Sequence, residues 1–256
     1  MTDASISIEN VTKSFSIKGN KDKVVAIEGI SLSVNQSEFV ALLGPSGCGK
    51  STILRLISSL DTPSEGTVKI DGQLPNSMVS DHSLGVAFQD HALLPWLTVR
   101  ENIALPLQIA NIPVDENLVT SMVDLVGLSG FEKARPKQLS GGMRQRVSIA
   151  RALILSPKVL LLDEPFGALD AVTRRHMNIE LQRIWALQKI TTVLVTHSVE
   201  ESVFLSDRIF VLSSRPGKII REVIVPFDRP RKQSIMRGNE FHKLVDELTE
   251  ALDSTE

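Results

Sequence analysis

The 256-residue sequence has no tyrosine and a single cysteine, and aromatic residues make up only 4% of it. An intramolecular disulfide needs two cysteines, so Cys48 forms none, and no Cys/His cluster has the spacing of a zinc site. The sequence suits a reducing compartment, and we expect a cytosolic protein. A hydrophobic fraction of 42% predicts a globular chain, of one large or two small domains, that needs no cross-links.

Long apolar runs and excess charge are missing too. No apolar run approaches the roughly 18 residues that cross a bilayer, and the first ten residues are polar with two acids. We therefore expect neither a signal peptide nor a membrane helix. The 28 Lys and Arg against 30 Asp and Glu give a net charge of −2, which disfavours nucleic acid as a partner.

The sequence does contain an alternation of short strand-like runs with longer helix-like runs, which predicts an α/β fold. Ile6–Val11, Val24–Ile27 and Ser31–Val34 alternate partly, as half-exposed antiparallel strands do. Three continuous apolar runs are typical of central strands buried on both faces: Phe39–Leu43, Val159–Leu162 and Thr192–Thr196.

Residues from about 92 to 156 carry helix signals without a buried strand. Thr98–Glu101 has the capping-box pattern, Asp115 marks a second helix start, and apolar periodicity predicts a helix over 141–155. We interpret the segment as a helical insertion.

Further helices are predicted over 50–60, 171–188 and 239–252. Ser198–Glu201 has a second capping-box pattern, so a helix should begin directly after His197. We treat residues 1–225 as one domain and 226–256 as a C-terminal extension. The basic residues of the extension are interpreted as a solvated face, in preference to a lipid or regulator contact: Arg229, Arg231, Lys232 and Arg237.

A glycine-rich loop lies between the first buried run and an amphipathic helix. Gly44–Ser51 matches G-x-x-x-x-G-K-[ST], and this context favours a phosphate loop over a glycine turn without a ligand. Its amides and the helix N-terminus attract phosphate, so we expect Lys50 to reach the β- and γ-phosphates and Ser51 to bind Mg²⁺. The nucleotide-binding residues predicted here are Gly44, Pro45, Ser46, Gly47, Cys48, Gly49, Lys50, Ser51 and Thr52.

Two adjacent carboxylates end the second buried run. Side chains alternate along a strand, so Asp163 and Glu164 should point in different directions. Asp163 can hold Mg²⁺ through its water shell, and Glu164 can act as a general base on the attacking water. The alternative is a pair of surface acids, which a phosphate loop in the same chain disfavours.

Leu139–Arg146 opens the helix over 141–155 and places Ser140, Gly141 and Gly142 at its positive end. These residues form either a second anion site or a plain structural N-cap. The eight residues LSGGMRQR favour the anion site, because they resemble the signature motif of ABC transporter ATP-binding subunits.

Five elements follow the order of that family: the phosphate loop, Gln89, the signature, Asp163 with Glu164, and His197. The resemblance covers residues 5–225. It implies a P-loop NTPase core of the RecA-like type with an N-terminal antiparallel β subdomain and an inserted α-helical subdomain. It also implies an ATPase whose cofactors are ATP and Mg²⁺.

The resemblance assigns further site residues. Phe15 resembles the aromatic that stacks on adenine, where the family often has tyrosine; the alternative is a core residue at a strand end. Gln89 resembles the glutamine that senses Mg²⁺ and water and touches the membrane subunit, although most glutamines are solvated loop residues. His197 resembles the histidine that contacts the γ-phosphate, with a satisfied structural histidine as the alternative.

Two positions depart from the family pattern. Gly167–Asp170 resembles the loop along the subunit interface, but many members have serine where Gly167 stands. Asp170 still fits the pattern and counts among the nucleotide-site residues. Met143 replaces a frequent glutamine of the signature, which we expect to alter packing more than phosphate contact.

The phosphate loop and the Ser140 helix start of one small chain cannot both bind the same nucleotide. A twofold dimer resolves this, because Lys50 of one copy and Ser140 of the other can clamp the same ATP, twice over. Cleavage of the γ-phosphate should then loosen the dimer. The resemblance adds an integral membrane permease near Gln89 and the helical insertion, a periplasmic or lipid-anchored solute-binding protein, and a peripheral location on the cytoplasmic face of the inner membrane.

Gln89–Asn102, Asp163–Asp170 and Ser214–Lys218 resemble importers for nitrate, sulfonates and taurine. An exporter subunit stays open, because motifs of hydrolysis do not encode direction. An ABC ATPase outside transport would usually carry a long coiled-coil insertion or a second cassette, and the sequence has neither. A GTP-dependent switch would need [NT]-K-x-D, and Asn20–Lys23 has the wrong last residue.

Overall fold

The computed structural model describes residues 5–16, 23–167 and 169–254. Ala168 of the Gly167–Asp170 segment and residues 20–22 of Asn20–Lys23 lie outside the described residues. Among the helices that are described, none combines the length and apolar character needed to cross a membrane.

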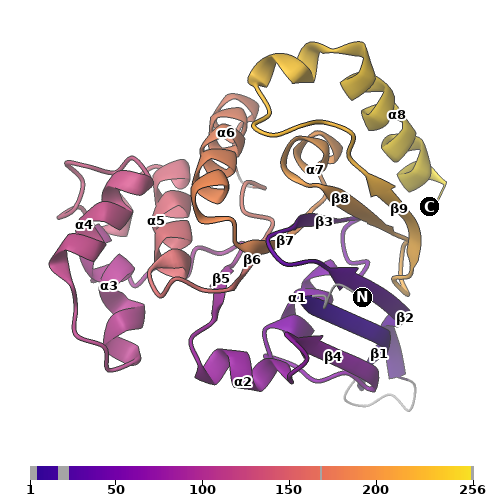
Figure 1. Ribbon diagram of the computed structural model, residues 1–256, viewed down its shortest axis with the longest axis horizontal. Coiled ribbons are helices and arrows are strands. Elements are labelled where there is room, and N and C mark those ends of the chain that lie inside the picture. Colours follow the sequence, from indigo (N-terminus) through magenta and orange to yellow (C-terminus); the bar gives the residue numbers. More distant parts are fainter. Residues whose placement is uncertain (1–4, 17–22, 168, 255–256) are drawn as a thin grey trace.

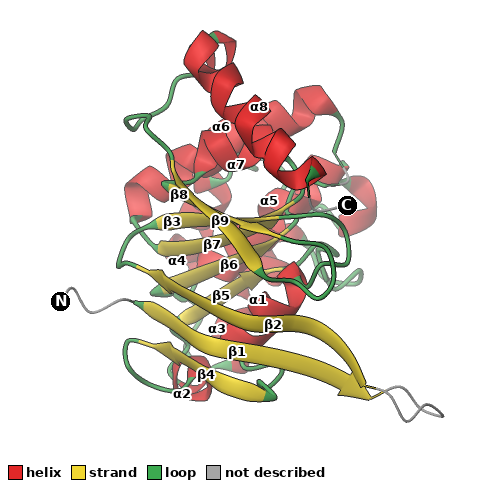
Figure 2. Ribbon diagram, turned by 90° about the vertical axis from the view of Figure 1, so that its right-hand side faces the viewer, coloured by secondary structure: helices red, strands yellow, loops and turns green. Residues whose placement is uncertain are grey.

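Two sheets form the body of the molecule (Figure 2). The antiparallel sheet has the order β2-β1-β4 and the larger sheet the order β5-β6-β7-β3-β8-β9, with only β9 antiparallel to its neighbour. The strands are β1 (Ile6–Ser16), β2 (Lys23–Val34), β3 (Phe39–Leu43), β4 (Glu65–Ile70), β5 (Leu84–Ala87), β6 (Val159–Asp163), β7 (Thr191–Thr196), β8 (Arg208–Leu212) and β9 (Ile219–Ile224). The three predicted central strands are confirmed as β3, β6 and β7.

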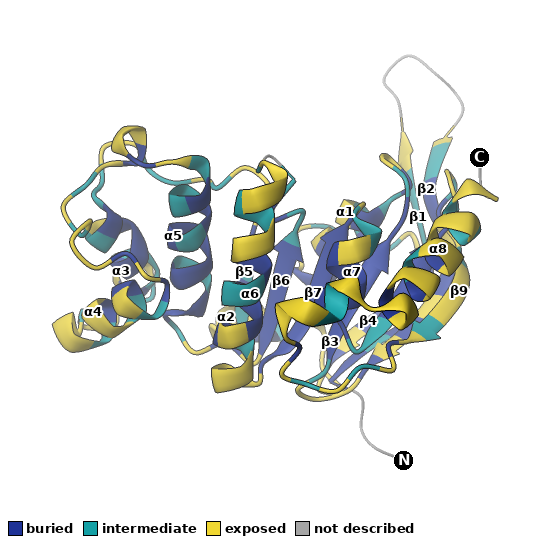
Figure 3. Cartoon of the chain, turned by 90° about the horizontal axis from the view of Figure 1, so that it is seen from above, coloured by how far each residue is buried: buried dark blue, intermediate teal, exposed yellow. Residues whose placement is uncertain are grey.

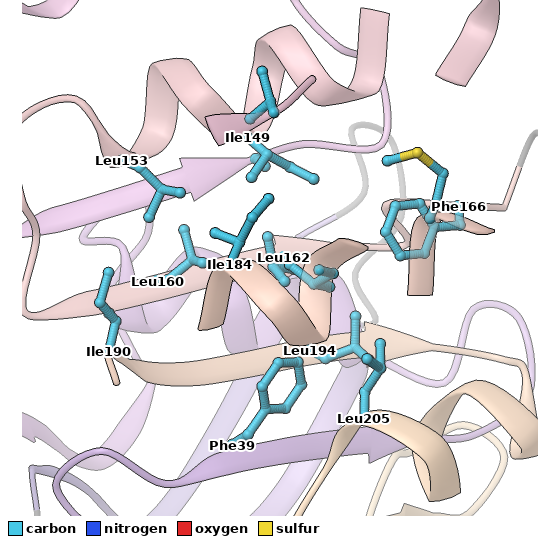
Figure 4. Close-up of a cluster of buried hydrophobic side chains, with 14 of the residues drawn as sticks. Phe39, Ile149, Leu153, Leu160, Leu162, Phe166, Ile184, Ile190, Leu194 and Leu205 are labelled. Carbon is cyan, nitrogen blue, oxygen red and sulfur yellow. The ribbon is translucent and has the colours of Figure 1, made fainter. Parts of the chain in front are cut away.

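Strand β3 is buried along its whole length because it lies between β7 and β8. Its side chains alternate between two apolar clusters. Phe39 and Leu43 join the cluster under the helices α5 to α8, part of which Figure 4 shows, whereas Leu42 joins the cluster between the two sheets. Its fully apolar sequence therefore follows from burial on both faces.

Helices surround the larger sheet and extend from it (Figures 1 and 3). The helices of the described residues are α1 (Lys50–Ile57), α2 (Pro75–Ser80), α3 (Val99–Ile109), α4 (Glu116–Leu125), α5 (Gly141–Leu153), α6 (Ala171–Gln188), α7 (Val199–Leu205) and α8 (Asn239–Asp253), with the 3-10 helices η1 (Pro136–Gln138) and η2 (Gln233–Arg237). Helices α3 to α5 form an arm at one end of the molecule, as the helical insertion predicts. The predicted capping box at Thr98 and N-cap at Asp115 are both confirmed.

The predicted capping box at the start of α7 is wrong in one of its two bonds. Ser198 Oγ accepts from the Glu201 backbone N–H at 3.3 Å, as predicted. The Glu201 carboxylate, however, accepts from the Thr196 hydroxyl and not from the Ser198 N–H. Glu201 itself is only 3% exposed, so its carboxylate pairs with the hydroxyl that ends β7.

The solvated face predicted for the C-terminal basic residues is also wrong in part. Lys232 and Arg237 are exposed, but Arg231 is 4% exposed and donates to the Val203, Phe204 and Ser206 carbonyl oxygens at 2.8–3.0 Å. The buried C-terminal end of α7 needs donors for its last carbonyls, and Arg231 supplies them. The guanidinium of Arg229 likewise lies 4.2 Å from the centre of the Trp185 ring.

The fold is thus an α/β P-loop arrangement with a mostly parallel core sheet, an N-terminal antiparallel β subdomain and an inserted helical subdomain. Helix α8 packs beside α7 and β8, and its apolar residues Phe241, Leu244 and Leu248 belong to the same core cluster as Phe39. The loops after β3, β6 and β7 meet at the carboxyl edge of the sheet, where ligands bind in such folds.

Candidate nucleotide site

A cavity of about 360 Å³ lies at this carboxyl edge. Its walls come from the end of β1, strand β2, the loop after β3, the start of α1, the loop after β5, the residue after β6 and the β8–β9 turn. The lining residues are Phe15, Ala26, Ser46, Gly47, Gly49, Lys50, Ser51, Thr52, Gln89, Glu164 and Arg215. The structure therefore brings together side chains that lie up to 200 positions apart, from Phe15 to Arg215.

The loop backbone after β3 has a shape that only glycine permits. Gly49, the N-cap of α1, has φ 107°, and a Cβ there would lie 2.4 Å from Ile27 Cγ2. Gly47 also has a positive φ, of 77°. Consecutive loop amides can then turn inward, which is the arrangement that binds phosphate oxygens.

Lys50 opens α1 and is buried, with 4% of its surface exposed. Its ammonium donates to the Gly44 and Pro45 carbonyl oxygens at 2.8 and 2.9 Å. These partners are neutral, so the charge of the ammonium is left for an anion in the cavity. Cys48 lies underneath, 1% exposed, and burial raises the pKa of its thiol. Cys48 therefore contributes packing and a backbone amide, not a thiolate.

Ser51 and Asp163 form an oxygen pair at the floor of the site. The Ser51 hydroxyl donates to Asp163 Oδ1 at 3.0 Å. Burial raises the pKa of Asp163, while the Ser51 bond and the nearby Lys50 charge oppose the shift. A hydroxyl and a carboxylate beside a phosphate loop are the donors that Mg²⁺ prefers, so the residues present fit that ion.

Glu164 is the meeting point of three loops. Its Oε2 lies 3.4 Å from Gln89 Nε2 and 3.2 Å from His197 Nδ1, and its own N–H donates to the Val195 carbonyl oxygen at 2.9 Å. The Glu164 side chain is 17% exposed and its φ is 42°. This left-handed backbone, not strand alternation alone, turns Glu164 away from Asp163 and into the cavity.

Phe15 forms the outer wall at the end of β1, with 40% of its surface exposed. The Lys13 ammonium lies 5.1 Å from its ring centre. An exposed aromatic ring at the mouth of a polar cavity offers a face to a flat ligand such as a nucleobase.

The second predicted anion site lies outside this cavity. Ser140 is the N-cap of α5 and accepts from the Met143 N–H at 3.3 Å, so its predicted position at the helix start is confirmed. It lies on the helical arm and is absent from the described lining of the cavity around Lys50. One chain therefore presents the two predicted anion sites apart from each other.

The segment before α6 packs against the start of α5. A Cβ on Gly141 would lie 3.3 Å from Leu169 Cδ2, and one on Gly142 would lie 3.2 Å from Thr173 Cγ2. Asp170 caps α6 by accepting from the Thr173 hydroxyl at 2.7 Å and from two backbone amides, and these bonds lower the pKa of its carboxyl. Asp170 thus has a structural role within its own chain.

Ala26 and Arg215 are the lining residues that sequence reasoning missed, and Arg215 is the one that carries a charge. It lies in the β8–β9 turn, far along the chain from the phosphate loop. The turn is held against the site by Gly217, whose N–H donates to the Ala26 carbonyl oxygen at 2.9 Å and where a Cβ would lie 2.0 Å from the Cys48 carbonyl oxygen. The only local signal was the Ser214–Lys218 resemblance, which pointed to a subgroup and not to a contact.

The fold and cavity define a P-loop nucleotide-binding protein, and comparison with known proteins gives its family. The sequence profile of the ABC transporter family matches residues 27–167. The chain belongs to this family, and it is an ATPase of the ATP-binding cassette type.

Similar proteins span nearly the same length. The chain is 46% identical to an uncharacterized ABC transporter ATP-binding protein of Methanocaldococcus jannaschii, over 94% of this chain and 89% of that protein. It is 45% identical to the nitrate import ATP-binding protein of Synechocystis, over 91% and 90% of the two chains. It is 45% identical to an aliphatic sulfonates import ATP-binding protein of Bacillus cereus, over 94% of each.

A solved structure supports the same assignment. A dimeric ATP-binding cassette in a post-hydrolysis state, bound to ADP and Pi, superposes with a TM-score of 0.77 at 32% identity. The match covers 87% of this chain and 100% of that one.

Proposed function

We propose that the chain is the ATP-hydrolysing subunit of an ABC importer, working as a homodimer that closes around two ATP molecules and drives a separate membrane permease. The observation that carries the proposal is the meeting of Lys50, Ser51 and Glu164 at one cavity, with His197 Nδ1 3.2 Å from Glu164 Oε2. Ser140 lies on the separate helical arm.

Each residue at the cavity has a role that its position supports. The buried Lys50 ammonium and the loop amides hold the β- and γ-phosphates, and Phe15 stacks on the base. Mg²⁺, held by Ser51 and Asp163 with Gln89 beside it, would neutralise phosphate charge. Glu164 takes the proton of the attacking water, and His197, at 3.2 Å from its Oε2, orients it and faces the γ-phosphate.

The dimer follows from the separation of the two anion sites. Under twofold symmetry the Ser140, Gly141 and Gly142 end of one α5 can reach the nucleotide on the partner's phosphate loop. The similar cassette with ADP and Pi is dimeric, which supports the arrangement. Loss of the γ-phosphate would remove the anion that both helix ends hold, and the dimer would loosen.

The permease contact is proposed on the helical arm. A hollow of about 610 Å³ is lined by Pro95, Trp96, Lys133, Arg135, Lys137 and Gln138, and Trp96 is 65% exposed. An exposed tryptophan among cations is typical of a protein interface. Two of its lining residues, Pro95 and Trp96, lie on the chain segment that follows Gln89, so permease movement can be transmitted to Glu164 through the Gln89 contact.

The location and solute follow from the same reasoning. We place the chain peripherally on the cytoplasmic face of the membrane, in a complex with permease subunits and a solute-binding protein. The nitrate and sulfonate import relatives favour a small anion as the solute, and the taurine assignment stays a prediction.

The ATPase step is tested by Glu164→Gln. The variant keeps the size and hydrogen-bonding shape of the side chain, so MgATP affinity should stay within about twofold while steady-state turnover falls at least 100-fold, the usual weight of a general base. Normal turnover in this variant would exclude Glu164 from the base role.

The transport assignment is tested by affinity purification of the tagged chain from detergent extracts of its host. We expect an integral membrane protein to co-purify with the wild type and with an Ile109→Ala control, and to be lost with Trp96→Ala. Recovery of soluble partners or nucleic acid alone would contradict the proposal. Reconstitution in liposomes with the recovered permease would then show which anion, with its binding protein, raises ATPase activity.

A further inference from the structure

Glu201 is a buried carboxyl group behind the nucleotide site. It occupies the third position of α7 and is 3% exposed. Its Oε2 accepts from the Thr196 hydroxyl, but within the described part of the chain Oε1 has no hydrogen-bond partner. A buried carboxyl with one oxygen unsatisfied is destabilising, so its presence calls for a role.

Hydrogen bonds connect Glu201 to the residues immediately before and after His197. Thr196 Oγ1, which donates to Glu201, also accepts from the Ser198 N–H at 3.0 Å. Ser198 Oγ in turn accepts from the Glu201 N–H at 3.3 Å. The residues on both sides of His197 are therefore tied to Glu201, and the ring between them lies 3.2 Å from Glu164 Oε2.

An arginine of α6 is close enough for its charge to act on this carboxyl and also holds the segment before α6. Arg174 on α6 is the positive charge that acts on Glu201. Its guanidinium donates to the carbonyl oxygens of Phe166, Gly167 and Leu169 at 3.1–3.4 Å. Leu169 packs close to Gly141, the first residue of α5. Arg174 thus holds the segment that contacts the start of α5, and its charge acts on Glu201.

We propose that Glu201 is a positioning residue for ATP hydrolysis: through Thr196 and Ser198 it holds the His197 turn in register with Glu164. The inference rests on the proposed function and deepens it. Glu201 does not touch the nucleotide, so it should affect the rate of the chemical step more than the binding of ATP.

The test compares Glu201→Gln with Glu200→Gln, an exposed neighbour on the same helix that serves as the matched control. We expect Glu201→Gln to lower kcat about tenfold with KM changed less than twofold, because a small displacement of a reacting group slows chemistry while binding contacts remain. Glu200→Gln should behave as the wild type. An unchanged kcat in Glu201→Gln would overturn the proposal.

A double-mutant cycle separates positioning from a general structural effect. If Glu201 acts through His197, then Glu201→Gln should cause no further loss of kcat in a His197→Ala background. If the fold-losses of kcat in the two single variants multiply in the double variant, Glu201 acts independently of His197, and the proposal is overturned.

A second pair of variants keeps the test decisive if Glu201→Gln fails to fold. Thr196→Val removes the hydroxyl at similar shape and should reproduce the tenfold loss of kcat, whereas Thr196→Ser keeps the hydroxyl and should restore it. Equal activity of the two would contradict the proposal. Glu164→Gln is measured in the same series: normal turnover there would refute the proposed function, whatever the Glu201 variants do.

Discussion

Glu164 shows at the residue scale what sequence can and cannot predict. Its role as a base follows from a carboxylate pair at the end of a buried strand, which the sequence displays. Its contacts with Gln89 and His197 join segments 75 and 33 residues away and needed the structure. Arg215 was missed for the same reason, because no local pattern reports a partner from a distant turn. Glu201 was predicted only as a capping residue, because its pattern does not show that the side chain is buried against Thr196.

Glu201 gives a pH dependence of stability at this scale. Burial raises the pKa of its carboxyl from 4.5 to about 7, with the Thr196 bond and Arg174 opposing the shift and Glu164 adding to it. Between these values the folded state holds a proton that the unfolded state has lost. The stabilisation is therefore complete below pH 4.5 and is lost as the pH rises to about 7.

The measurement is the free energy of unfolding in urea of the wild type and of Glu201→Gln from pH 5 to 8. The variant cannot titrate at this position, so the wild type should lose stability relative to it by up to about 3 kcal/mol. A difference that stays constant across this range would mean that the pKa of Glu201 is not raised.

At the element scale, local signals predicted the helices well. Thr98, Asp115 and Ser140 are N-caps in the sequence and in the structure, and helix α6 occupies the predicted residues. Strands of the antiparallel sheet were less predictable: β1 continues to Ser16, and β4 was not predicted. β4 is a short edge strand with only Val68 and Ile70 buried, so its pattern is weaker than that of β3.

The C-terminal segment is the element whose role was misjudged. A run of charged residues in a sequence predicts a solvent-exposed segment, but the Arg231 side chain donates to the last carbonyl oxygens of α7. The Gln182 side chain also forms two hydrogen bonds with the Arg231 backbone, at 2.7 and 2.8 Å. Only the three-dimensional position of the α7 carbonyls explains this burial. Whether a domain boundary belongs at residue 225 stays a prediction.

Arg231→Ala should therefore destabilise the protein, while Lys232→Ala, its exposed neighbour, should not. The first leaves three carbonyl oxygens of α7 without their donor and is expected to lower the free energy of unfolding by about 3 kcal/mol. The second should stay within about 0.5 kcal/mol of the wild type. Urea unfolding of both variants checks this, and equal midpoints would show that Arg231 does not secure α7.

At the scale of the whole molecule, the proposed mechanism depends on the helical arm as well as on the cavity, because each carries one of the two predicted anion sites. Ser140 on α5 and Lys50 on α1 are the two positive helix starts of the proposed site, and the structure presents them on separate parts of the chain (Figure 1). A nucleotide held from both sides then requires a second copy, which would make ATP part of the interface.

The most direct test of this sandwich uses two single-cysteine exchanges in the Glu164→Gln background, Ser46→Cys in one preparation and Ser140→Cys in the other. Both positions are exposed, whereas the native Cys48 is buried. Mixed with MgATP and an oxidant, the two proteins should form an intermolecular disulfide, with ADP giving little and each protein alone none. If MgATP yields no cross-linked dimer and the chain still sediments as a single protomer, the central claim is contradicted.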